Sequence, residues 1–72
     1  MNYENITKAC LLVFDILRHD DDLASKKTIE LIDNAETDDE IRNGLREAVV
    51  RLDIIRPDIA NEIREKTKGF AF

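Results

Sequence analysis

Cysteine, histidine, glycine and proline are all scarce in this sequence, and each scarcity excludes a class of structure. Cys10 is the only cysteine, so the chain cannot form an internal disulfide. One cysteine and one histidine cannot supply the four ligands of a structural zinc site. Two glycines and one proline leave little room for a turn-rich β fold. A chain of 72 residues without such staples depends on regular helix packing or on self-association for its stability.

Long apolar runs and targeting signals are also missing. The longest uninterrupted apolar run covers residues 9–14, far short of the roughly 20 residues that span a membrane. The N-terminus lacks the basic region and cleavage site of a signal peptide. Together with an unpaired cysteine, these features predict a cytoplasmic protein that has no contact with membranes.

Acidic side chains outnumber basic ones and are unevenly distributed. The net charge is −5, with 11 acidic and 4 basic residues in 1–40 but 5 acidic and 7 basic residues in 41–72. An acidic total argues against direct binding to DNA or RNA, for which cationic contacts to phosphate supply most of the non-specific affinity. The asymmetry favours head-to-tail contacts between copies, or a basic partner docked on the acidic half.

Apolar side chains recur with helical spacing and predict an all-α fold, a compact bundle of three to four antiparallel helices forming one domain over residues 1–72. We expect helices at about 3–18, 22–35, 38–56 and 57–68, joined by connections short enough to make neighbours antiparallel. Arg56 before Pro57 ends the third helix. Because a proline can bend a helix without ending it, one kinked helix in place of the last two is the alternative.

The third helix gives the clearest local signal. Thr37 and Glu40 form a capping box at its start. One broad apolar face is predicted to face the core, and Val50 and Ile54, four residues apart, lie on a different face. The members of the broad face are Ile41, Leu45, Ala48, Val49, Leu52 and Ile55. A helix with two apolar faces usually has two sets of neighbours.

The remaining segments are read in the same way. The first helix is apolar over more than half of its circumference, with only Leu11 among its polar residues. Asp21 or Asp22 is expected to cap the second helix. Gly69 fits a left-handed position after the last helix, followed by an apolar contact from Phe70. The inward face of the second helix is expected to contain Ala24, Thr28, Leu31, Ile32 and Ala35.

Five apolar side chains have no obvious place in a small monomeric bundle, and we interpret them as an interface. They are Leu11, Val50, Ile54, Phe70 and Phe72. With the unusually apolar first helix, they predict a homo-oligomer, most simply a twofold dimer. The alternative is that the fourth helix and the tail fold back and cover them.

Candidate chemistry is sparse. The segment His19–Asp22 resembles a metal site in composition, but consecutive residues do not point at one centre, so we interpret it as a solvated connection that caps a helix. Cys10 lies on an apolar face, as expected of a structural thiol. Arg42, Arg46 and Arg56 share one edge of the third helix and are interpreted as solvated charge beside the core, with a docking patch for an acidic partner as the alternative. We expect no enzyme activity, no metal and no cofactor.

Two functions are compatible with this pattern. The first is a small acidic protein–protein interaction module, a regulator, adaptor or inhibitor of phage or plasmid type, acting as a homo-oligomer. The second is an oligomer that binds a nucleotide or other small anion, because lysines near a helix N-terminus attract phosphate. The residues that would form that anion site are Tyr3, Lys26, Lys27 and Thr28.

Overall fold

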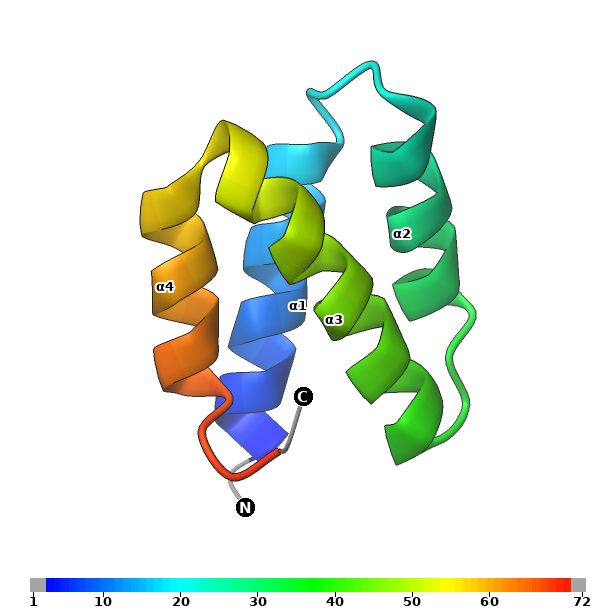
Figure 1. Ribbon diagram of the computed structural model, residues 1–72. Helices are drawn as coiled ribbons and strands as arrows, with labels where there is room; N and C mark the ends of the chain where they lie inside the picture. Colours follow the sequence, from blue (N-terminus) through cyan, green and yellow to red (C-terminus); the bar gives the residue numbers. More distant parts are fainter. Residues whose placement is uncertain (1–2, 71–72) are drawn as a thin grey trace.

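Four α-helices account for most of the chain in a computed structural model that describes residues 3–70. They are α1 (Tyr3–Leu17), α2 (Leu23–Asp33), α3 (Asp38–Ile55) and α4 (Pro57–Lys66), with no strand among the described residues. Successive helices run in opposite directions, and α3 crosses in front of α1 with α4 on one side and α2 on the other (Figure 1). The predicted all-α bundle is therefore confirmed. None of these four helices is long and apolar enough to cross a membrane.

Side-chain caps fix where two of the helices begin. The Asp22 carboxylate accepts the backbone N–H of Ala24 at 2.8 Å and caps α2. At the start of α3, the Thr37 hydroxyl oxygen accepts the backbone N–H of Glu40 at 3.2 Å and donates to the Glu40 carboxylate at 3.1 Å. Each cap satisfies an N–H group that has no partner within its own helix.

The break between α3 and α4 decides between two helices and one kinked helix. Arg56 has φ −147° and ψ 74°, outside the helical region, and its N–H still closes α3 on the Leu52 carbonyl at 2.7 Å. Pro57 then occupies the first turn of α4, where its missing N–H costs nothing. The two helices are separate, and α4 folds back against α1 and α3.

The core is continuous across all four helices and includes the broad apolar face expected for α3. Leu45, Ala48 and Leu52 are fully buried there, while Ile41 and Ile55 are half-buried at its edges. Burying a side chain of this size stabilises the fold by about 1.5–3 kcal/mol. The buried apolar residues are Ile6, Ala9, Val13, Leu17, Ile32, Leu45, Ala48, Val49, Leu52, Ala60, Ile63 and Phe70.

The end of the described chain turns back into this core. Gly69 has φ +88° and sits in a turn that closes from the Phe70 N–H to the Thr67 carbonyl at 2.9 Å. The Phe70 side chain is only 1% exposed, with the Arg42 guanidinium 4.7 Å from its ring centre. Phe70 therefore belongs to the core of its own chain, and not to an exposed interface as expected. Phe72 lies outside the described residues.

The inward face of α2 is rotated relative to the sequence expectation. Ser25, Thr28 and Ile32 are buried, whereas Ala24 is exposed and Leu31 is 48% exposed. The reason is the contact with α3, where Gly44 has no side chain and Ile32 fills the space beside it. A Cβ atom at position 44 would stand 2.5 Å from the Cγ1 atom of Ile32.

This contact generates a stability prediction. We expect Gly44→Ala to destabilise the fold, because forcing a methyl group into packed space costs about 1–3 kcal/mol against a gain of about 1 kcal/mol in helix propensity. In an Ile32→Ala background the obstructing Cγ1 atom is gone, and the same substitution should become stabilising. Urea unfolding followed by circular dichroism checks both values. Equal stabilisation in both backgrounds would contradict the close contact.

Candidate protein interaction surface

The outward side of α3 carries a line of four exposed residues, which we call the α3 ridge: Asn43, Glu47, Val50 and Ile54. Val50 is 60% exposed and Ile54 is 70% exposed. Residues 57–70 of the same chain therefore do not cover this pair. The spacing of four, three and four residues is that of the seam between two paired helices.

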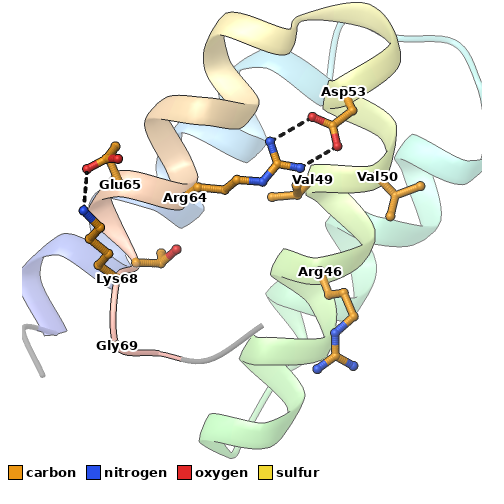
Figure 2. A pocket seen from close by; sticks show the side chains of 9 residues that line it. Arg46, Val49, Val50, Asp53, Arg64, Glu65, Lys68 and Gly69 are labelled. Atoms are coloured by element: carbon orange, nitrogen blue, oxygen red, sulfur yellow. Dashed lines mark hydrogen bonds and ion pairs between the residues drawn. The ribbon is translucent and has the colours of Figure 1, made fainter.

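A groove of about 540 Å³ separates the ridge from α4, and we call it the α4-side groove (Figure 2). Val49 and Val50 supply its apolar part. Across it, the Arg64 guanidinium donates to both oxygens of Asp53 at 3.0 and 2.6 Å, which lowers the pKa of the Asp53 carboxyl. Lys68 pairs with Glu65 at 3.4 Å. Arg46, on the α3 side, donates to the Asn43 side-chain oxygen at 3.2 Å.

A second groove, of about 390 Å³, lies on the other flank of α3 and is called the α2-side groove. Leu31 is its exposed apolar residue. Lys27, Glu30 and Asn34 of α2 line it together with Glu40 of α3. The ridge itself borders the α4-side groove through Val50, whereas Glu40 is the residue that α3 contributes to the α2-side groove.

A polar cluster holds the C-terminal half of α3 against the connection between α1 and α2. The Asp20 carboxylate accepts the Ser25 hydroxyl at 2.6 Å and the Arg51 Nε–H at 2.8 Å. Arg51 also lies 3.8 Å from Asp22, the residue that caps α2. These bonds, from Arg51 first and Ser25 second, lower the pKa of Asp20 to about 2. The cluster therefore ties α3 to the connection before α2 at Arg51.

The predicted interface residues are not all brought together. Val50 and Ile54 share the ridge. Leu11 is 59% exposed but lines a different groove, of about 600 Å³ between α1 and α4, together with Leu12 and Phe14. Helical spacing places Leu11 on the surface correctly, but it gives no information about which surfaces are adjacent.

The predicted anion-site residues are also dispersed. Tyr3 begins α1 and donates to the Asp38 carboxylate at 2.9 Å, while Lys26 and Lys27 lie near the start of α2, at the opposite end of the bundle (Figure 1). The 15-residue length of α1 separates the two ends by roughly 20 Å. Thr28 is buried, and its hydroxyl donates to the Ala24 carbonyl at 2.9 Å.

The other candidate groups have structural surroundings. Cys10 is half-buried on α1, and this burial raises the pKa of its thiol. His19 is exposed in the connection after α1. Within residues 3–70, no group of three or more His, Cys, Asp or Glu side chains is placed to hold a metal ion.

Comparison of the chain with protein-family models, curated proteins and solved structures finds no match. The candidate surface is therefore defined by its own exposed side chains, grooves and charges. The α3 ridge combines the two most exposed predicted interface residues of the described chain with the α4-side groove, which Val50 lines. The ridge is therefore our candidate for the surface that binds another protein.

The polar cluster generates a pH prediction. The Asp20 pKa of about 2 lies below its ordinary value of 3.8. Because the folded state has the lower pKa, ionised Asp20 stabilises the fold fully above about pH 4 and loses this effect as the pH falls towards 2. We expect Asp20→Asn to lower the thermal midpoint at neutral pH, and the difference from wild type to shrink in acid.

Thermal unfolding between about pH 7 and pH 2 measures this difference. Asp21→Asn is the matched control, because Asp21 is exposed in the same connection. It should leave the midpoint nearly unchanged at every pH. A deficit of Asp20→Asn that stays constant down to pH 2 would contradict the assignment.

Proposed function

We propose that this protein is a small acidic protein–protein interaction module that acts as a helical homo-oligomer, most simply a twofold dimer. One observation carries the proposal: Val50 and Ile54 stand exposed one turn apart on α3, at 60% and 70%. Single exposed apolar residues are ordinary. Two on one seam, with Val50 also lining the α4-side groove, favour a second helix as their neighbour.

The size of the molecule supports a modest interface. Stable protein pairs bury about 800 Å² on each partner. The accessible surface of this chain is 4585 Å², so a dimer would cover roughly a sixth of it. Val50 and Ile54 are too small to supply that area alone. We infer that both flanking grooves take part.

The exposed acidic segments favour a second kind of partner, a basic surface on another protein. Asp38, Asp39 and Glu40 are exposed at the start of α3, and Asp21 and Asp22 are exposed before α2. Exposed carboxylates of this density suit a basic groove on a larger target. A regulator, adaptor or inhibitor in the cytoplasm is the role proposed.

The anion-binding alternative has less support. Its four residues lie at two ends of the bundle, and the hydroxyl groups of Tyr3 and Thr28 already donate within the chain. Only Lys26 and Lys27 remain exposed next to each other. An adjacent lysine pair on a helix surface is ordinary solvated charge.

Substitution of the ridge tests the proposal. We expect Val50→Asp and Ile54→Asp to convert the oligomer to a monomer, because a carboxylate buried in an apolar contact is strongly unfavourable. The fold should be retained with a change of less than about 0.5 kcal/mol, since both sites are exposed in one chain. Light scattering coupled to size exclusion measures the mass, and circular dichroism measures the fold.

Leu11→Asp is the matched control, with similar exposure on another surface. It should leave the mass unchanged. A wild-type protein that remains monomeric at several hundred micromolar would contradict the proposal. If Leu11→Asp dissociates the oligomer and the ridge substitutions do not, the interface lies at the groove between α1 and α4 and the proposal is contradicted.

A further inference from the structure

The two grooves beside the α3 ridge carry opposite net charge. Five charged side chains line the α4-side groove, and three of them are basic. Three charged side chains line the α2-side groove, and two of them are acidic. The groove between α3 and α4 therefore has a net positive lining and the groove between α3 and α2 a net negative one, while Val50 and Ile54 are the exposed apolar residues of α3.

Arg46 is the principal cation of the first flank. Each of the other five arginines in the described part of the chain forms an ion pair with a carboxylate. Arg46 contacts only the Asn43 side-chain oxygen, at 3.2 Å. Its side chain lines the α4-side groove, and the guanidinium points away from Val50, toward the start of α3 (Figure 2).

Glu30 is its counterpart on the second flank, and the packing of α2 on α3 sets its height. Ile32 lies against Gly44, and the two helices run in opposite directions. Two residues before Ile32 therefore correspond to two residues after Gly44. From this register we infer that Glu30 lies at about the height of Arg46 along α3. Like Arg46, Glu30 forms no ion pair within residues 3–70.

We propose that a second copy of this chain docks on the ridge with its α3 parallel to the first, so that Arg46 of each copy pairs with Glu30 of the other. A twofold axis parallel to α3 places the α4-side groove of one copy opposite the α2-side groove of its partner. An axis perpendicular to α3 places each groove opposite its own copy, so that like charges meet. Charge complementarity thus selects the parallel arrangement. The inference rests on the proposed self-association.

Glu47 provides an unfavourable contact that is specific to this arrangement. It lies on the ridge between Asn43 and Val50, so a parallel pair of helices brings it near its own copy. Like charges at such a seam weaken a helix pair, and a polar group there fixes register at a cost in stability. Glu47→Gln is expected to tighten the parallel dimer severalfold.

A charge exchange tests the pairing. We expect Arg46→Glu and Glu30→Arg each to weaken the dimer about tenfold, because every substitution reverses two contacts in a twofold dimer. The double variant Arg46→Glu/Glu30→Arg restores both pairs, and it should regain most of the lost affinity. Sedimentation equilibrium on the full chain measures all four dissociation constants. If the dissociation constant of the double variant is raised by the product of the two single effects, the pairing is overturned.

Cross-linking tests the direction of the helices independently. In a Cys10→Ser background, Asn43→Cys and Ile54→Cys place single thiols roughly 16 Å apart along α3. A parallel dimer should cross-link each variant to itself under oxidation. Efficient cross-linking only between the two different variants, when mixed, would show antiparallel helices.

The outcomes separate the two proposals. A dimer with antiparallel cross-links, or with no recovery in the double variant, overturns the parallel arrangement and leaves self-association standing. A wild-type chain that sediments as a monomer overturns both. Recovery in the double variant with cross-links at both positions supports both.

Discussion

The close approach of α2 and α3 at Gly44 is the contact on which the candidate surface depends. Ile32 occupies the space that a side chain at position 44 would fill. This contact sets the register of the two helices and the rotation of α2, which buries Ser25 and exposes Leu31. The face opposite the core then presents Val50 at the α4-side groove. A different residue at position 44 would change which α2 side chains border the ridge.

Local signals in the sequence were sufficient for the helices and for the buried face of α3. Caps, a proline and apolar periodicity act over a few residues, so the capping by Thr37 and the break at Pro57 could be predicted. The direction of α2's inward face could not. Ser25 is buried because Asp20 satisfies its hydroxyl, and Asp20 is held by Arg51, which is 31 residues away. Contacts of this kind have no periodic signature.

The same distinction applies to the surface. Helical spacing identified Leu11, Val50 and Ile54 as outward-facing, and all three are exposed. Phe70, grouped with the interface residues, is instead buried, because the turn at Gly69 returns its ring to the core beside Arg42, as the local Gly69–Phe70 pattern indicated. Spacing also gave no indication that Leu11 lies on a different surface from the ridge. Adjacency between helices depends on their packing, which becomes evident only in the folded chain.

The central claim is that the α3 ridge is an interface between protein molecules. A series of nitrogen–proton correlation spectra, recorded as the protein is diluted from several hundred to about ten micromolar, tests it most directly. We expect the amide signals of Asn43, Glu47, Val50 and Ile54 to shift with concentration, whereas those around Leu11 stay fixed. Signals that are independent of concentration throughout, or that shift only around Leu11, would contradict it.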